Sequence, residues 1–370
     1  MDDLSVISFR LQLVSAPMIT SKTTLSATPM LSRFLLPVLI ACFPFATRNA
    51  IAQVDRVFPF TGNPVVGKIT EIRPQGVVIE VSGTPQTIAI DKIRRVMFED
   101  EPNFLTRGRD FVLDGDFEQA MEMLGKVDFA EIKRDAIKAD AMYYLARSES
   151  ALALIGRGNI AEATRKMNAF ATANRQSLHF YPAAKVLGDL AIASGNHEQA
   201  LRYYAALAQA PAAEMKIEAE YLSGNALLRQ GKLPEAEASF AKVGGATVDS
   251  AEGVRLKSLA KAGQAVVLAK QGNAQQALSL VSSLIGELAP VDSQLGARIY
   301  NAQGACLEAL NDREGAVLAY LHTHLMFSGQ ADAHAEALLR LVELWPQVGH
   351  PERAAQARQE LQQRYPGWLK

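Results

Sequence analysis

The sequence predicts a mainly α-helical protein, a right-handed α-solenoid of about seven helical hairpins preceded by a small antiparallel β-barrel domain. Two observations lead to this fold class. A turn residue followed five positions later by alanine occurs seven times between Gly115 and Ala354, and short β-branched runs precede the first of these pairs. A repeat spacing of roughly 35 to 45 residues is typical of stacked helical units.

The composition is that of a folded protein without a strong charge bias. The chain has 370 residues, of which 49% are hydrophobic and 21% are charged, and its formal net charge is −1. That content is sufficient for a sizeable core, and the balanced charge gives no general attraction to nucleic acid or to an anionic membrane. A partner must therefore be recognised by a local patch.

Residues 1–52 predict an N-terminal extension that ends in a cleaved signal peptide. Arg33 supplies the positive flank, residues 34–45 the apolar core, and Ala52 the last small residue before cleavage ahead of Gln53. This order is that of a secretory signal, and its length fits a true start at Met30. We therefore expect an exported bacterial protein, periplasmic or associated with the cell envelope.

The two cysteines allow a second interpretation of the N-terminus. Cys42 follows Leu-Ile-Ala, which resembles the site where bacterial lipoproteins are cut and acylated, so a lipid anchor at Cys42 is the alternative to cleavage after Ala52. An uncleaved segment is the third possibility. Each cleavage leaves Cys306 without an intrachain disulfide partner, and its apolar helical surroundings predict a buried, inert thiol.

Residues 53–98 predict a small SH3-like or Sm-like β domain. Short runs at 65–72, 77–81, 87–90 and 95–98 are separated by Gly, Pro and Asp turns, as in an antiparallel meander. Residues 99–102 are acidic and predict a linker. From residue 103 to residue 370 the apolar spacing becomes helical.

The repeated pair marks the turn between two antiparallel helices. Its first residue ends a helix in the left-handed conformation, and its alanine lets the next helix pack closely. The pairs are Gly115/Ala120, Gly158/Ala163, Gly195/Ala200, Gly231/Ala236, Gly272/Ala277, Asn311/Ala316 and Gly349/Ala354. The following residue is expected to cap the second helix at Asp116, Asn159, Asn196, Asn273 and Asp312.

Small and large residues recur at fixed distances from each alanine. Twelve positions before the alanine the residue is small in six of the seven units, and four positions after it a large side chain is usual. The small residues are Gly108, Ala151, Gly188, Gly224, Ala265 and Gly304, with Val342 in the last unit. The later positions hold Leu124, Met167, Tyr204, Phe240, Val281, Tyr320 and Arg358. We expect these two sets to fill the space between the helices.

With these offsets the region 103–366 resembles the tetratricopeptide repeat (TPR). The alanines are 43, 37, 36, 41, 39 and 38 residues apart, longer than the 34 of the family, and the family's tryptophan is absent. The resemblance implies a concave face, lined by the first helix of each unit, that binds peptides or protein segments. It places Lys185, Asp189, Tyr221, Asn225, Asn301 and Glu308 in that groove. Leu222, Leu259 and Gly263 replace the family's carboxylate-binding clamp, which argues against a tail-binding co-chaperone.

Three motifs suggest chemistry that their surroundings do not support. Residues 62–69 approach a phosphate-binding loop, but they lack the final Ser/Thr and lead into a strand pattern rather than a helix. His322 and His324 are two residues apart on a helix, which is wrong for a shared metal ion, so these two and nearby His334 are interpreted as surface histidines. The aspartates at 110, 114 and 116 lack the glutamate of a calcium loop.

The sequence therefore predicts a non-catalytic scaffold with no cofactor and no metal, whose partners are envelope proteins or peptides. A second hypothesis makes the β-barrel a nucleic-acid or glycan-binding module, through Lys92, Arg94 and Arg95, with the repeats as an oligomerisation arm. A cryptic enzyme is the third, and it requires a polar pocket.

Overall fold

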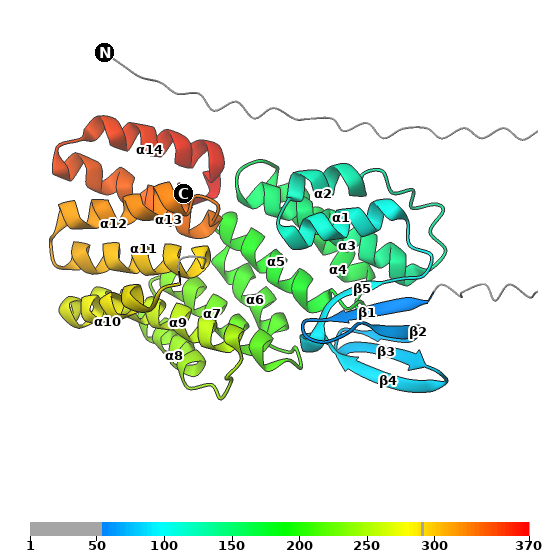
Figure 1. Ribbon diagram of the computed structural model, residues 1–370. Coiled ribbons are helices and arrows are strands. Elements are labelled where there is room, and N and C mark those ends of the chain that lie inside the picture. The colour runs from blue at the N-terminus through cyan, green and yellow to red at the C-terminus, as the bar shows by residue number, and fades with distance from the viewer. Residues whose placement is uncertain (1–53, 290–291, 370) are drawn as a thin grey trace, which may run out of the picture. The chain divides into compact units, whose positions relative to one another are not determined.

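The computed structural model describes residues 54–289 and 292–369, all of which belong to one compact unit of the chain. The predicted signal peptide, its cleavage between Ala52 and Gln53, and Cys42 lie outside the described residues. The described part contains a five-stranded antiparallel sheet followed by helices only (Figure 1). This confirms the predicted fold class.

The first four strands of the sheet pair in succession, and the fifth strand pairs with the free edge of the first. The strands are β1 (Asp55–Pro59), β2 (Val65–Arg73), β3 (Gly76–Val81), β4 (Thr84–Ala89) and β5 (Ile93–Met97), in the order β4-β3-β2-β1-β5. The β2–β3 register shifts between Ile69 and Glu71, a bulge that bends and twists the sheet. A phosphate-binding loop must lead into a helix, whose N-terminus holds the phosphates. Residues 62–69 instead form a turn that leads into strand β2, so they are not such a loop.

One face of the sheet shares its core with the first helices. Val57, Val77 and Val96 are buried in the same cluster as Leu105 and Leu124 of the first hairpin.

The predicted linker at 99–102 belongs to this contact between the sheet and the helices. Its Glu101 side chain is only 4% exposed and binds Arg109 of α1 through both carboxylate oxygens, at 2.9 and 2.7 Å. A charged linker is expected to be solvated, but Glu101 is buried together with the arginine that neutralises its charge.

The helices pair in succession as antiparallel hairpins (Figure 1). Fourteen α-helices occur in the described residues, which gives the seven hairpins that the repeat spacing predicts. They are α1 (Asn103–Asp114), α2 (Phe117–Leu124), α3 (Asp135–Leu154), α4 (Ile160–Ala173), α5 (Phe180–Ala193), α6 (His197–Leu207), α7 (Ala213–Arg229), α8 (Leu233–Gly244), α9 (Ala251–Lys270), α10 (Ala274–Glu287), α11 (Ser293–Ala309), α12 (Arg313–Met326), α13 (Ala331–Leu344) and α14 (Pro351–Arg364).

The turn chemistry follows the prediction in six hairpins and departs from it in one. Five glycines of the repeated pairs have positive φ, and Asn311 takes the same conformation with φ 62°. The five are Gly115, Gly195, Gly231, Gly272 and Gly349. In the second hairpin the left-handed residue is Gly156, with φ 80°, rather than Gly158. Arg364 of α14 lies against Gly156, where an added Cβ would be 2.6 Å from the Arg364 Cα, so the packing of a distant helix also requires glycine here.

Four of the five predicted caps are made. The side chains of Asp116, Asn159, Asn196 and Asp312 each accept a hydrogen bond from the amide three residues ahead. Asn273 is the N-cap residue of α10 as predicted, but its side chain makes no such hydrogen bond.

The alanine that closes each repeated pair is a buried core residue. In every hairpin it falls in the first turn of the second helix and is at most 8% exposed. The seven are Ala120, Ala163, Ala200, Ala236, Ala277, Ala316 and Ala354. Their side chains belong to the hydrophobic clusters that join the helices, which is the packing role that the spacing predicts.

The small and large positions of the repeat meet in space. A Cβ added to Gly224 would lie 2.6 Å from the Phe240 ring, and one added to Gly304 would lie 2.6 Å from the Tyr320 ring. Glycine on the first helix thus leaves room for the aromatic ring of the second.

Two further predictions concern membrane contact and the free thiol. Within residues 54–289 and 292–369, no helix combines the length and apolarity that a membrane span requires. Cys306 is fully buried and unpaired, and burial raises the pKa of its thiol to about 11. The thiol is therefore protonated near neutral pH, as expected of an inert core cysteine.

Candidate functional site

The first helices of the hairpins enclose two adjoining cavities. Their volumes are about 440 and 400 Å³, and Ile192, Asn225, Arg229 and Trp368 line both of them. Side chains of α3, α5, α7, α9, α11 and α13 supply most of the wall. These are the helices that the TPR resemblance assigns to the concave face. Cavities of this size fall in the range of ordinary ligand sites.

Five of the six predicted groove residues line these cavities. Lys185 and Asp189 line one, Tyr221 and Asn301 line the other, and Asn225 lines both. Glu308 lines neither of them, because its carboxylate accepts a hydrogen bond from Arg340 Nε at 2.9 Å. The three clamp-replacing residues divide differently: Leu259 and Gly263 line the larger cavity and Leu222 the smaller.

The repeat-defining alanines are not part of this site. They lie on the second helices, where the packing of helix against helix buries them, and none of them lines either cavity. This holds for Ala120, Ala163, Ala200, Ala236, Ala277, Ala316 and Ala354. The residues that define the repeat and the residues that could contact a ligand are therefore different sets, and of the repeat-defining turn residues only Gly195 lines a cavity.

Arg298 of α11 anchors two carboxylates of α13. It forms ion pairs with Asp332 and with Glu336, the latter at 3.1 Å. Although burial alone would lower the pKa of Arg298, Asp332 raises it above its usual value, and Arg298 in turn lowers the pKa of the Asp332 carboxyl despite its burial. Arg298 and Asp332 are therefore fixed as ions, which favours charge recognition over proton transfer.

Arg229, at the end of α7, is held differently. Its Nη2 atom is buried and has no hydrogen-bond partner, and the nearest carboxylate oxygens, on Asp332 and Glu336, are 3.9 and 4.0 Å away. Burial lowers the pKa of its guanidinium, and the surrounding carboxylates are already bound to Arg298. Buried donors without an acceptor are rare in folded proteins, which makes this Nη2 atom a candidate for contact with a bound group.

A second charged group lies on α5 at the other end of the cavities. Lys185 Nζ is 3.4 Å from Asp189 and 3.6 Å from Glu218 of α7, and Asp189 raises the pKa of the lysine. The Tyr204 hydroxyl donates a hydrogen bond of 2.9 Å to Asp189. The carboxylate is thus satisfied within the chain, whereas the lysine still presents a donor to the cavity.

Positive charge exceeds negative charge on the cavity wall. Five cationic side chains and three anionic ones line the two cavities together. The cations are Arg147, Lys185, Arg229, Lys270 and Arg298, and the anions are Asp189, Asp332 and Glu336. Because the whole chain carries a formal charge of −1, this excess is local.

The C-terminal segment covers the cavities. The Arg364 side chain donates a hydrogen bond to the Ile155 carbonyl at 3.4 Å, across 209 positions of sequence. Gly367 packs against the Ala193 carbonyl at the end of α5, and Trp368 lines both cavities. The resemblance implies an open groove, but contacts between distant repeats close part of it.

The other candidate residues lie away from the cavities. His322 stacks on Tyr300 with 3.8 Å between ring centroids, and His324 instead contacts His334. His334 is 0% exposed, so its assignment to the helix surface is wrong.

The basic cluster of the β domain is largely paired. Lys92 pairs with Asp91, and Arg95 pairs with Asp110 of α1. Of the three basic residues, only Arg94 has no ion pair within the described residues, and it is exposed.

Comparison with known proteins supports the fold and gives no family. No family model matches the sequence, and no curated protein matches it. A solved Rap protein in complex with competence and sporulation factor superposes with a TM-score of 0.53 at 16% identity, over 72% of this chain and 75% of that one. A tetratricopeptide repeat protein from Parabacteroides merdae gives 0.48 at 18%, over 70% and 91%. The chain has a TPR-like fold of helical hairpins.

Sequence reasoning missed the residues that dominate the cavity wall. Arg229 follows Tyr221 and Asn225 at four-residue steps on α7, so extending that series would have found it. Arg298 precedes Asn301 by three residues on α11 and shares its face. No local signal identifies Trp368, because a contact with Arg229 from the end of the chain has no sequence pattern.

Proposed function

We propose that this protein is a non-catalytic binding protein of the bacterial cell envelope, which holds an acidic segment of a protein or peptide in the cavities lined by its first helices. The observation that carries the proposal is the buried Nη2 donor of Arg229, which has no acceptor within the described residues. A carboxylate is a fitting acceptor, because guanidinium–carboxylate hydrogen bonds are short, strong and directional.

The charges around Arg229 support an acidic ligand. Its two nearest carboxylates are bound to Arg298, and the wall carries five cations against three anions. Asn301 adds a buried side-chain oxygen without a hydrogen-bond partner, which suits a donor such as a peptide N–H. An extended peptide offers both groups, a side-chain carboxylate and backbone amides.

The fixed ionisation states support binding rather than catalysis. Asp332 and Arg298 hold each other charged, and the pKa of Tyr221 is raised by burial. The polar pocket that an enzyme requires is present, but its charged groups are paired for recognition rather than poised to exchange protons near pH 7. The Rap protein of similar fold is described in complex with a factor, which is consistent with a binding role.

The test is selection of peptides from a random displayed library on the folded chain, followed by affinity measurement. We expect the selected peptides to be enriched in Asp and Glu. Arg229→Gln should weaken their binding by about tenfold or more, as loss of a charge-assisted hydrogen bond does. Arg202→Gln is the matched control, because Arg202 is exposed on α6 and bonds to Gln199 on its own helix. Equal binding by wild type and Arg229→Gln, or selection without acidic enrichment, would overturn the proposal.

The envelope location rests on the sequence of residues 1–52 alone, and it needs its own measurement. Intact-mass spectrometry of the protein purified from a bacterial host should give a chain that begins at Gln53. A mass that corresponds to acylation at Cys42 would show that the protein is lipid-anchored there and is not cleaved after Ala52. An unprocessed chain in the cytoplasm would contradict export.

A further inference from the structure

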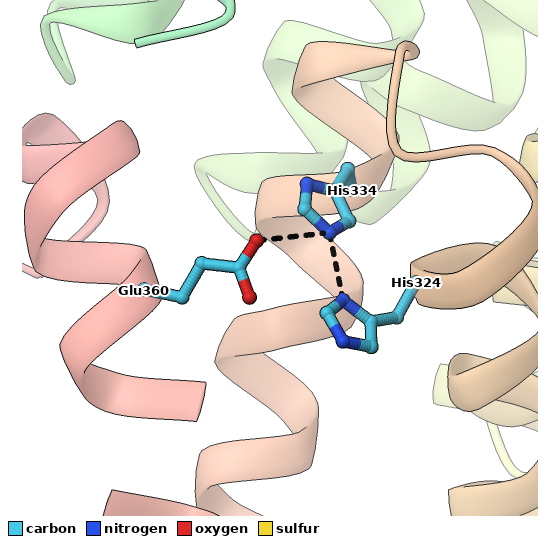
Figure 2. Close-up of side chains that lie close together, drawn as sticks. All are labelled: His324, His334 and Glu360. Atoms are coloured by element: carbon cyan, nitrogen blue, oxygen red, sulfur yellow. Dashed lines mark hydrogen bonds and ion pairs between the residues drawn. The ribbon is translucent and has the colours of Figure 1, made fainter. Parts of the chain in front are cut away.

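A second group of polar side chains lies in the last two hairpins, and it plays no part in the cavities described above. His324 is in the last turn of α12, His334 is in the first turn of α13, and Glu360 is in the last turns of α14. Figure 2 shows the three side chains converging from three different helices. Their ligand atoms all lie within 4.8 Å of one another.

The distances inside this group are close to those of a metal-binding site. His324 Nδ1 is 2.8 Å from His334 Nε2, and His334 Nε2 is 3.8 Å from Glu360 Oε1 (Figure 2). In a tetrahedral zinc site with bonds of 2.0–2.1 Å, neighbouring ligand atoms are about 3.3 Å apart. One distance is shorter than this value and the other is longer, so a shift of about half an ångström would bring each of these two pairs to it.

The orientation of His334 presents a lone pair to the group. The ring is fully buried, and its Nδ1 atom lies 2.9 Å from the Tyr365 hydroxyl. With Nδ1–H donated to that hydroxyl, the Nε2 lone pair points towards His324 and Glu360. A neutral imidazole oriented by its other nitrogen is the usual form of a histidine metal ligand.

We propose that His324, His334 and Glu360 form a binding site for a divalent transition-metal ion, for which zinc is the best match. Two imidazole nitrogens and one carboxylate oxygen are a common zinc ligand set. His324 and Glu360 are partly exposed, so an ion can enter from solvent and keep water as its fourth ligand. The Tyr365 hydroxyl acts behind His334 as the group that orients its ring.

Arg364 is the charged neighbour that opposes a cation here. Its Nη1 atom is 2.9 Å from Glu360 Oε1, and it approaches His334. The same guanidinium also donates to the carbonyls of Ser328 and Ile155, at 3.2 and 3.4 Å. These carbonyls would still hold Arg364 if Glu360 turned towards the ion. The glutamate then offsets the added charge, since it is the one carboxylate in the group.

A metal ion at this position would connect three helices and the C-terminal segment. It would join α12 to α13 and α14, and through His334 it would fix Tyr365, three residues before Trp368. The ion would hold three helices at one point near the end of the repeat array. The site is independent of the cavity ligand, so either proposal can fail without the other.

The experiment is a Zn²⁺ titration of untagged full-length protein against a chromophoric chelator, with Co²⁺ substitution to give a visible ligand-field spectrum. We expect one Zn²⁺ per chain. His324→Ala and Glu360→Gln should each lower the affinity by about tenfold or more. His322→Ala is the matched control, because His322 is exposed on the same helix and stacks on Tyr300. His334→Ala is avoided, since loss of a buried ring could unfold the last hairpins.

Thermal unfolding provides the second measurement. Zn²⁺ should raise the midpoint temperature of wild type and of His322→Ala, and at the same Zn²⁺ concentration should raise that of His324→Ala by less, because an ion that binds only the native state stabilises it by mass action. The proposal is overturned if wild type binds no Zn²⁺ in competition with the chelator. It is also overturned if His324→Ala binds Zn²⁺ as tightly as His322→Ala does.

Discussion

The Arg229 guanidinium lies over the Trp368 indole, 4.0 Å from the ring centroid. This contact joins the end of α7 to the C-terminal segment, 139 positions later in the sequence. A cation–π contact of this kind orients Arg229 while leaving its buried Nη2 donor unused. The C-terminal segment is thus part of the cavity wall, and its loss should change both stability and binding.

The Arg229–Trp368 contact can be measured by a double-mutant cycle. We expect Arg229→Met and Trp368→Leu to be coupled by about 0.5–2 kcal/mol in urea unfolding, the range of a partly desolvated cation–π pair. Arg229→Met combined with Trp345→Leu is the control, because Trp345 stacks with other residues. Additive effects of the Arg229 and Trp368 substitutions would contradict the contact.

The close approach of α7 and α8 depends on Gly224. Gly224→Ala would place a Cβ 2.6 Å from the Phe240 ring, so we expect a loss of about 1–3 kcal/mol in the free energy of unfolding. Gly286→Ala is the control, because no heavy atom lies within 4 Å of its added Cβ and its helical position is exposed. That substitution should be neutral or stabilising by up to about 1 kcal/mol. A Gly224→Ala protein as stable as Gly286→Ala would contradict the packing.

The junction between the sheet and the repeats depends on Arg109. This fully buried guanidinium binds Glu101 and, at 2.7 Å, Asp140 of α3, whose other oxygen contacts His179 at 2.6 Å. Arg109→Met would remove the buried cation that binds both Glu101 and Asp140, so we expect a loss of about 3–5 kcal/mol in the free energy of unfolding, measured by chemical denaturation.

The control for Arg109 is an exposed arginine. Arg165→Met, at an exposed pair with Glu162, should leave the free energy of unfolding nearly unchanged. Similar losses in the Arg109 and Arg165 variants would contradict a buried network.

The Asp55 carboxyl should make the free energy of unfolding depend on pH. Burial alone would raise the pKa of its carboxyl, but hydrogen bonds from Arg134 and from the Glu99 and Ile69 amides outweigh it and lower the pKa. Because the folded pKa is below the unfolded value of about 3.9, the stabilisation is present above pH ~4 and is lost as the pH falls through the folded pKa.

Asp55→Asn tests this sign directly. At pH 5–8 the variant should be less stable than wild type by about 1–3 kcal/mol, and the difference should shrink as the pH falls below about 4 and through the folded pKa. Asp114→Asn, at an exposed position, should follow the wild-type curve. A difference between Asp55→Asn and wild type that grows in acid would show that the carboxyl is not held ionised by these partners.

Much of the candidate site follows from the resemblance to the tetratricopeptide repeat. That resemblance places Tyr221 and Asn225 in the groove, and the two residues share one side of α7 because a helix presents every fourth residue to the same side. Glu308 shares that periodicity but binds Arg340, a partner that the spacing of one helix does not reveal. His324 was assigned to the surface because its sequence neighbour His322 cannot share a metal with it, whereas the residues that it meets are on α13 and α14.

The sequence by itself determined the hairpins of this protein. Helix ends, caps and the glycine–aromatic contacts depend on residues within about sixteen positions of one another, so their rules are visible in a linear pattern. The tertiary structure decides which distant segments meet: Arg364 contacts Gly156 and the Ile155 carbonyl, and His324 and Glu360 meet at His334. Those outcomes depend on small rotations accumulated over many stacked units, and no single unit encodes their sum.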